Sequence, residues 1–302
     1  MKIGQFTTRL VACATLALAG AVTAQAQNAI SYVSVAGNDA NNCTASAHCR
    51  TFTRALSVTN SGGEVIAVDS GGYGPATISK PVTLTAIGID ASITAASGGD
   101  ALTINTSGNV TIVGLSLHGA AVGNDGILVE NVGFLRVYNL TAHNFVNDGI
   151  QFASAGALAV YNSSFTDNGH DGLLLEHAAY RAYVNGSTFD NNAFAGADSS
   201  KGKMTVVDSS AHYNNRAFFA DGGTLTLTND RAIFNEVGLV ASGTTGVNGA
   251  GHLYFANCLV SDNATSYDVG AGGTLAGSTP GTTLIAPGQT KVGTLTAPIA
   301  LQ

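Results

Sequence analysis

The chain has 302 residues, of which 45% are hydrophobic, enough to form a sizeable core. Only 10% are charged; Asp and Glu total 19 against 12 for Lys and Arg, and the formal net charge is −7. This acidic balance and the lack of any basic stretch argue against nucleic acid and anionic membrane surfaces as partners.

The first residues have the pattern of a signal peptide, residues 1–26. Lys2 and Arg9 give a positive start, an apolar run extends from Val11 to Ala24, and a small-x-small cleavage site ends at Ala26. The run is too short to span a bilayer, and no stop-transfer segment follows. The alternative, a buried core helix, is disfavoured because no polar face accompanies the run. We expect cleavage near Ala26 and a secreted, periplasmic or cell-surface protein.

Three cysteines remain after such cleavage. Cys43 and Cys49 are expected to form a disulfide across a short loop, because an exported protein meets an oxidising compartment. Cys258 lies in the apolar segment FANCLV and is expected to be a buried free thiol. No Cys-x-x-Cys pair is present, so a structural zinc site is not expected.

An internal repeat of about 23 residues runs through the middle of the chain. Asp-Gly pairs begin at Asp125, Asp148 and Asp171, and an aliphatic residue follows each pair. A second series consists of Asn139, Asn162, Asn185, Asp208, Asn229 and Asn257. A third series follows six residues behind and consists of Asn168, Asn191, Asn214, Asn235 and Asn263. Repeats of this length indicate a solenoid.

The composition of each repeat selects the type of solenoid. Short runs rich in Val, Leu, Ile, Phe, Tyr and Thr alternate in polarity and are broken by Asn, Asp and Gly, which is typical of strands and turns. No repeat holds an apolar stripe with helical period. We predict an all-β right-handed parallel β-helix whose coils each contain three strands. Asn should occupy left-handed corners and bond the next coil, and Gly of Asp-Gly should supply positive φ.

The predicted domain organisation follows from these patterns. Residues 27–62 should hold an N-terminal strand, the disulfide loop and a cap helix with Phe52, Ala55 and Leu56 at helical spacing. Residues 63–270 should form the β-helix, a rod of about 40–50 Å. Residues 271–302 should form a C-terminal cap, because solenoid ends expose apolar faces.

The coils resemble the repeats of the pectin-lyase-like superfamily. The start of the mature chain is similar to that of many secreted bacterial members, at Tyr32-Val33-Ser34, Gly37-Asn38-Asp39, Cys43 and Cys49-Arg50-Thr51-Phe52. The resemblance covers nearly the whole mature chain and implies the β-helix fold. Many members are polysaccharide lyases, hydrolases or epimerases, and others are adhesins or tailspikes, so the resemblance leaves function open.

The catalytic motifs of these enzymes are absent. None of the five prolines has Arg two places before it, as the pectate lyase motif Arg-x-Pro requires. Gly169-His170-Asp171 only approaches the Gly-His-Gly of polygalacturonases, whose other three motifs are missing, as is the epimerase Asp-Pro-His. Catalysis therefore stays uncertain.

Five residues are nevertheless candidates for catalysis: His170, Asp171, Glu176, Arg181 and Lys203. His170 takes the place that Asn holds one and two coils earlier, so it is either a turn residue or an acid or base beside carboxylates. In a strict 23-residue frame Lys203 stacks under Tyr180, and Glu176 and Arg181 share that face. The alternative is a solvated solenoid face.

Further candidates concern substrate and metal. Tyr138, Tyr161, Tyr180 and Arg136 are expected to bind substrate, or else to line the solenoid wall. Asp125, Asp148 and Asp171 would stand about 5 Å apart, and Ca²⁺ could relieve their repulsion. No other cofactor is expected.

Two functions fit these observations. The first is an exported protein, expected to be monomeric, that binds or modifies a polysaccharide along the solenoid. The second is a non-catalytic surface or adhesive rod. A groove with convergent cations, carboxylates and aromatic rings would favour the first function.

Overall fold

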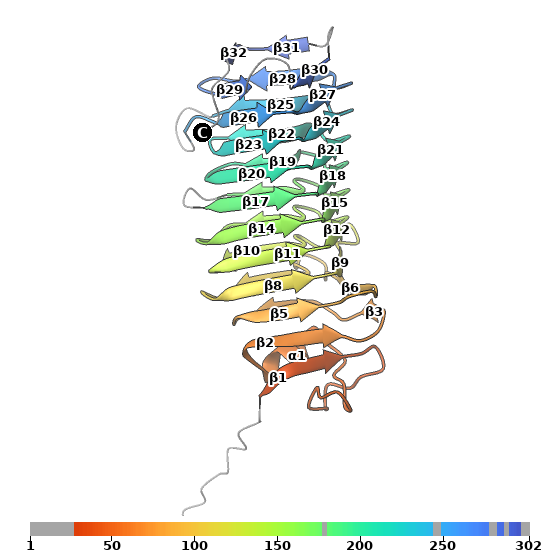
Figure 1. Ribbon diagram of the computed structural model, residues 1–302. Helices are drawn as coiled ribbons and strands as arrows, with labels where there is room; N and C mark the ends of the chain where they lie inside the picture. The colour runs from red at the N-terminus through yellow and green to blue at the C-terminus, as the bar shows by residue number, and fades with distance from the viewer. Residues whose placement is uncertain (1–26, 177–179, 244–248, 278–282, 287–289, 297–302) are drawn as a thin grey trace, which may run out of the picture.

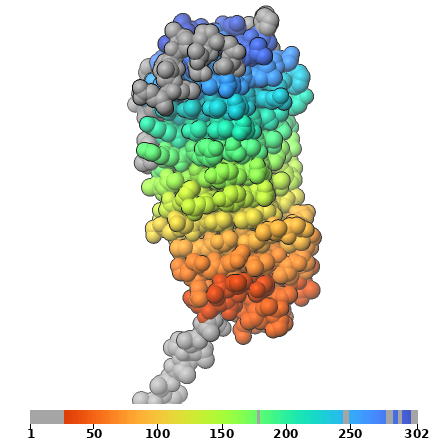
Figure 2. Space-filling view, viewed as in Figure 1, coloured from red at the N-terminus to blue at the C-terminus, as the bar shows by residue number. Residues whose placement is uncertain are grey.

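The computed structural model describes residues 27–176, 180–243, 249–277, 283–286 and 290–296. The expected signal peptide, residues 1–26, lies outside the described residues, as does part of the expected C-terminal cap. The described chain forms a rod of stacked coils (Figure 1), and its coils follow one another as successive layers in the space-filling view (Figure 2). Three parallel sheets run along the rod.

Each complete coil gives one strand to each sheet, and equivalent strands of successive coils pair in parallel. Sheet 1 has twelve strands: β1 (Asn28–Val33), β2 (Thr59–Ala67), β5 (Val82–Thr85), β8 (Asn109–Val113), β11 (Phe134–Tyr138), β14 (Ala157–Tyr161), β17 (Arg181–Asn185), β20 (Lys203–Val207), β23 (Thr224–Thr228), β26 (His252–Ala256), β29 (Thr274–Gly277) and β32 (Leu295–Thr296). Of these, β1 and β32 lie outside the complete coils and add one strand at either end of sheet 1.

Sheets 2 and 3 have ten strands each. Sheet 2 consists of β3 (Gly71–Gly72), β6 (Ala91–Thr94), β9 (Leu115–His118), β12 (Thr141–His143), β15 (Ser164–Thr166), β18 (Thr188–Asp190), β21 (Ser210–His212), β24 (Arg231–Ile233), β27 (Leu259–Ser261) and β30 (Leu284–Ile285). Sheet 3 consists of β4 (Ala76–Ile78), β7 (Leu102–Asn105), β10 (Ile127–Asn131), β13 (Ile150–Phe152), β16 (Leu173–Leu175), β19 (Ala195–Ser199), β22 (Arg216–Asp221), β25 (Val237–Ser242), β28 (Thr265–Val269) and β31 (Thr290–Val292).

The core lies inside the coils and consists of stacked apolar rungs. Leu135 and Val137 of β11 are buried, and their partners in β14 are also apolar and buried. Phe165 and Phe189 stack inside sheet 2 with ring centroids 5.3 Å apart. The two-residue alternation along each strand therefore places one face in the core and the other in solvent, as the sequence predicts.

The N-terminal end is closed as predicted. Helix α1 (Phe52–Val58) begins at Thr51, whose hydroxyl accepts the backbone N–H of Arg54 at 3.1 Å. The helix packs on β1 and β2 at the end of the rod (Figure 1). Cys43 and Cys49 form the expected disulfide. Cys258 is a buried thiol, and burial raises its pKa to about 12.

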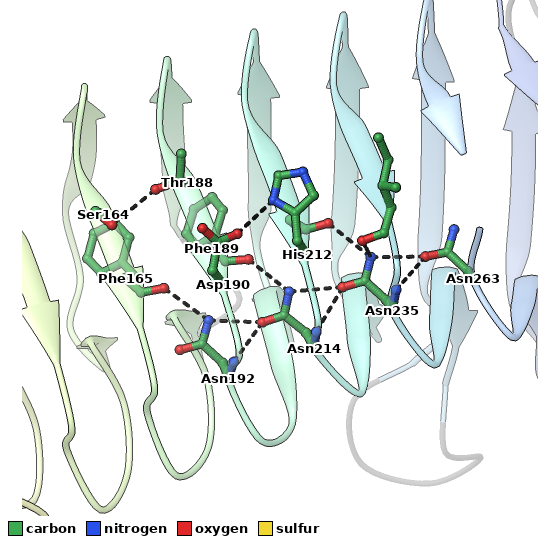
Figure 3. A network of polar contacts seen from close by, with 12 residues as sticks. Ser164, Phe165, Thr188, Phe189, Asp190, Asn192, His212, Asn214, Asn235 and Asn263 are labelled. Carbon is green, nitrogen blue, oxygen red and sulfur yellow. Dashed lines mark hydrogen bonds and ion pairs between the residues drawn. The ribbon is translucent and has the colours of Figure 1, made fainter. Parts of the chain in front are cut away.

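An internal asparagine ladder forms the turn between sheets 2 and 3 (Figure 3). Asn192 Nδ2 donates to Asn214 Oδ1 at 3.0 Å, and the backbone N–H of Asn192 donates to the same oxygen at 2.8 Å. The prediction of Asn191 as a ladder residue is wrong, because the coil from Leu173 to Ala197 is one residue longer than 23. Asn192 therefore faces inward. The ladder consists of Asn168, Asn192, Asn214, Asn235 and Asn263.

The corner between sheets 1 and 2 uses left-handed residues, as expected for the second Asn series. Asn139, Asn162, Asp208, Asn229 and Asn257 all have positive φ. Asn185 does not belong to this set, since Gly186 takes the left-handed position with φ 62°. The same longer coil moves this turn by one residue.

The Asp-Gly glycines serve a different purpose from the predicted one. Gly126, Gly149 and Gly172 are not among the positive-φ residues. A Cβ on Gly149 would lie 2.5 Å from the carbonyl oxygen of Gly172 and 2.7 Å from the Phe165 ring. Glycine is needed here for close packing between coils, not for a left-handed backbone.

Candidate functional site: the outer face of sheet 1 and the His170 turn

The outer face of sheet 1 carries a row of tyrosines on successive strands. Tyr138 of β11 pairs in register with Tyr161 of β14, and their rings stack with centroids 5.0 Å apart and an interplanar angle of 8°. Tyr183 on β17 lies diagonally beside this pair, because its register partner on β14 is Ala159. Its ring centroid is 5.8 Å from that of Tyr161, and the two ring planes are tilted by 52°. Tyr183 was missed by sequence reasoning, because a strict 23-residue frame from Tyr161 leads to Val184 and not to Tyr183.

Cations lie on the same face. Arg181 of β17 and Lys203 of β20 are exposed register partners on neighbouring strands. The guanidinium of Arg136 on β11 lies 3.9 Å from the ring centroid of Phe134. The sequences of β11, β14, β17 and β20 contain no Asp or Glu. This part of an acidic protein therefore presents positive charge beside phenol groups.

The predicted grouping of Tyr180 and Glu176 with these cations differs from the structure. Lys203 pairs with Arg181 and not with Tyr180, because the register of this coil departs from 23 residues. Tyr180 is buried, and its ring packs edge-on against Phe152 with centroids 5.5 Å apart. Glu176 follows β16 of sheet 3, where its carboxylate accepts Gln151 Nε2 at 3.0 Å. Only Arg181 and Lys203 of that predicted cluster share an outer face.

The His170 turn lies between sheets 2 and 3 and brings predicted residues together. His170 Nδ1 lies 3.2 Å from Asp148 Oδ1 and 3.0 Å from Asp171 Oδ2. The imidazole stacks on the ring of Phe194, one coil further, with centroids 4.6 Å apart. About half of the His170 side chain (47%) is exposed to solvent.

The three aspartates of the Asp-Gly series are buried rungs that bond the backbone of the next coil. Asp125 Oδ1 accepts the N–H of Asp148 at 3.0 Å, and Asp148 Oδ1 accepts that of Asp171 at 2.8 Å. Asp171 Oδ1 accepts the N–H of Ala195 at 2.8 Å. Burial raises the pKa of Asp125 to about 7 and that of Asp171 to about 6, although the contact with His170 opposes the shift at Asp171.

These carboxylates determine the protonation of His170. The hydrogen bond with Asp148 raises the pKa of His170 most, the one with Asp171 adds to it, and the pKa reaches about 10. The ring is therefore an imidazolium at neutral pH and has no free lone pair with which to act as a base. The charged ring neutralises the buried carboxylates of Asp148 and Asp171. This contact gives His170 a structural role that does not require catalysis.

Asp198 of β19 was missed by the sequence analysis. It is almost fully buried, and its Oδ1 has no hydrogen-bond partner among the residues that the structure describes. Burial, together with the charges of Asp171 and Asp221, raises its pKa well above the ordinary value. The only sequence signal is an acidic residue in the small-residue segment AGADS. The raised pKa favours the neutral carboxyl, which is less costly to bury than a carboxylate.

Comparison with known families places this architecture. The family model described as a right-handed β-helix region matches residues 42–203, more than half of the chain. The chain belongs to the right-handed β-helix family. No curated protein matches the sequence significantly.

Solved structures agree with the right-handed β-helix assignment. A pectate lyase, Pel9A, superposes with a TM-score of 0.61 at 17% identity, covering 88% of this chain and 78% of that one. An alginate lyase from Paenibacillus sp. str. FPU-7 superposes with a TM-score of 0.60 at 15% identity, covering 87% and 98%. At these identities the similarity shows the fold alone. In the described part of this β-helix protein, no helix is long and apolar enough to cross a membrane.

The calcium site predicted at Asp125, Asp148 and Asp171 can be tested against the ligand atoms that the structure brings together. One ligand atom from each of Asp148, His170 and Asp171 lies within 4.8 Å of the others, and Asp125 is not part of the group. Ca²⁺ takes six to eight oxygen ligands. Here one carboxylate oxygen of each Asp already accepts a backbone N–H, and an imidazole nitrogen lies between them. This donor set does not fit calcium.

Proposed function

We propose that this β-helix protein binds an acidic polysaccharide whose chain lies along the outer face of sheet 1. The observation that carries the proposal is the row of Tyr138, Tyr161 and Tyr183 beside the exposed pair Arg181 and Lys203. The charge of this face is opposite to that of the chain as a whole, which is −7. A uronate chain would find cations for its carboxylates and phenol groups for its hydroxyls.

The periodicity of the face supports a linear ligand. Neighbouring strands of a sheet lie about 4.8 Å apart, and each coil repeats the outward positions of the last. A polysaccharide also repeats its hydroxyl and carboxylate groups at a regular interval. A chain parallel to the rod axis can therefore make similar contacts on successive coils, which a compact ligand cannot do.

We further propose that binding, rather than cleavage, is the main activity and that it takes place outside the cytoplasm. The disulfide between Cys43 and Cys49 supports an oxidising compartment. Among the predicted catalytic residues, His170 already forms an ion pair with Asp171, and Asp171 also accepts a backbone N–H from the next coil. A rod that binds glycan without turnover also accounts for the absence of the enzyme motifs.

The proposal is tested by titrating the purified protein with polygalacturonate and alginate, and with dextran as a neutral reference, in a calorimeter. We expect the double variant Arg181→Ala/Lys203→Ala to lose at least about tenfold in affinity for the acidic chains, a loss of about 1.4 kcal/mol. Arg231→Ala, an exposed cation of β24 on sheet 2, is the matched control and should bind normally. Unchanged binding in the double variant would remove this face from the proposal.

The same samples decide between binding and modification. Absorbance of unsaturated products and release of reducing ends are followed during each titration. Turnover that disappears in the double variant would make the protein a lyase or hydrolase with its site on sheet 1. If no polysaccharide is bound or modified, the result would favour a structural or adhesive rod.

A further inference from the structure

One turn position in the corner between sheets 2 and 3 is occupied by aromatic residues in two consecutive coils. This position adopts the left-handed backbone conformation in six coils, with φ between 55° and 60°. Four coils fill it with Asn or Asp, residue types that tolerate this conformation: Asn144, Asp167, Asn191 and Asp262. Two neighbouring coils instead carry Tyr213 and Phe234, for which positive φ is a genuine outlier.

Burial in the core does not compensate for this choice. The side chains of Tyr213 and Phe234 are in solvent, with 63% and 51% of each residue exposed. The two rings stack on one another with centroids 5.6 Å apart and an interplanar angle of 11°. These bulky side chains have a disfavoured backbone conformation and are also exposed to solvent. Such a combination indicates that they are kept for binding and not for stability.

The ring pair borders an open groove that follows the rod. The groove has a volume of about 870 Å³ and is lined by residues from five successive coils, from Asn144 to Glu236. Gly169 and Ala193 contribute small residues to it. Five coils span about 20 Å, which is enough for several units of a linear ligand.

The polar lining of the groove defines the chemistry of that ligand. Asn191 Nδ2 donates to Asp167 Oδ1 at 2.6 Å, and Asn215 Nδ2 donates to Glu236 Oε2 at 2.9 Å. These exposed amide and carboxylate pairs can both donate to and accept from hydroxyl groups. The described residues that line the groove include no Lys or Arg. Arg216 lies behind this lining, where its guanidinium donates to Asn215 Oδ1 at 2.9 Å. An anionic ligand would therefore meet two carboxylates and no cation among the lining side chains.

We propose that this groove, formed beside Tyr213 and Phe234, is a second carbohydrate site that takes a neutral linear oligosaccharide. The apolar C–H surface of the sugar would pack against the exposed rings, and its hydroxyls would bond the Asn, Asp and Glu side chains. The site lies on a different part of the rod from the cationic face of sheet 1 and takes uncharged rather than anionic sugars. It does not depend on acidic polysaccharide binding at sheet 1.

The repeat supplies a test variant that should fold. Tyr213→Asn/Phe234→Asn installs a residue type that other coils use at this left-handed position, so the variant should unfold at a temperature no lower than the wild type. Calorimetric titration with the hexasaccharides of cellulose, xylan, mannan and amylose measures binding. We expect the wild type to bind at least one of them and the double variant to lose at least about tenfold in affinity. Tyr254→Ala, on β26 of sheet 1 and outside both proposed sites, is the control and should bind the neutral sugar normally.

Three outcomes would overturn the proposal. The wild type could bind none of the four neutral hexasaccharides, or the double Asn variant could bind as tightly as the wild type. Sedimentation could also show that the wild type self-associates and that the Asn variant does not. That last result would make the ring pair a contact between two copies of the chain.

Discussion

His170 Nδ1 lies 3.2 Å from the Oδ1 of Asp148, a residue of the preceding coil that is buried beneath it. The contact couples a half-exposed imidazole to a carboxylate that also accepts the backbone N–H of Asp171. The two coils are thus joined by a charge pair as well as by sheet hydrogen bonds. This arrangement makes the stability of the rod dependent on pH.

The first prediction concerns His170→Asn, which restores the residue type found at Asn147 one coil earlier. The folded-state pKa of His170 is about 10, above the ordinary 6.5. A raised histidine pKa gives stability that is fully present below about 6.5 and is lost as pH rises through about 10. We expect the variant to melt below the wild type at pH 6 and the gap to narrow at pH 10.5. An NMR titration of the ring with a midpoint near 6.5 would contradict this account.

The second prediction concerns Asp125→Asn, which keeps an oxygen for the backbone N–H of Asp148. Burial raises the pKa of Asp125 to about 7 from 3.8, so ionisation of the folded protein is disfavoured. Stability is then lost as pH rises from about 4 to about 7, because the unfolded carboxyl releases its proton first. We expect the variant to melt at a higher temperature than the wild type at pH 8. At pH 3.5 the difference should disappear, and a gain that is equal at both pH values would rule out this cause.

The third prediction tests the register of the asparagine ladder. Asn192→Ala removes an internal amide that bonds both neighbouring coils, so the buried N–H of Asn168 loses its acceptor and the carbonyl of Phe165 loses its donor. We expect a loss of about 2–4 kcal/mol in the free energy of unfolding, since each unsatisfied buried group costs about 1–3 kcal/mol. Asn191→Gly is the matched control. It keeps the left-handed backbone and loses only an exposed bond, so the change should stay within about 0.5 kcal/mol. Urea unfolding of both variants measures the difference.

The distinction between Asn191 and Asn192 shows how far the sequence predicts this fold. Alternating strands and a repeated turn specify stacked coils, because each coil must bury the same face in the same core. The position of each residue is set by strand pairing, however, and one inserted residue moves a whole turn. A 23-residue frame therefore selects Asn191, Asn185 and a Lys203–Tyr180 pair where the structure has Asn192, Gly186 and a Lys203–Arg181 pair.

The candidate sites were predictable only in part. The stacked pair Tyr138 and Tyr161 follows from the repeat, and its structure confirms their contact. The exposure of Tyr213 and Phe234 could not be predicted, because aromatic residues in a strand-rich sequence are usually core residues. Their exposure depends on a left-handed turn position that the sequence of one coil does not reveal. Asp198 was missed for a similar reason, since nothing in AGADS indicates that an outward strand position is buried.

The fourth prediction concerns metal binding at the Asp148, His170 and Asp171 group. A ligand that binds only the folded state raises the melting temperature, and the stabilisation grows with the logarithm of one plus the ratio of its concentration to its dissociation constant. Because the donor set does not fit calcium, we expect millimolar CaCl₂ to leave the melting temperature unchanged from that in EDTA. A rise that is absent in Asp148→Asn would show that calcium binds at this turn after all. MgCl₂ at equal concentration controls for ionic strength.

The last prediction concerns the strain at Tyr213 and Phe234. A residue held in a disfavoured region of backbone space costs about 1–3 kcal/mol, and Asn reduces that cost because its short side chain tolerates the left-handed region. Loss of the ring stack between the two residues offsets about 0.5–1.5 kcal/mol of the gain. We expect Phe234→Asn to raise the free energy of unfolding by about 1 kcal/mol, or about 2–4 °C in melting temperature. Phe234→Ala lacks the Asn preference and should gain less. If Phe234→Asn lowered the melting temperature, the rings would stabilise the fold by their stacking, and the argument that they are kept for a ligand would lose its basis.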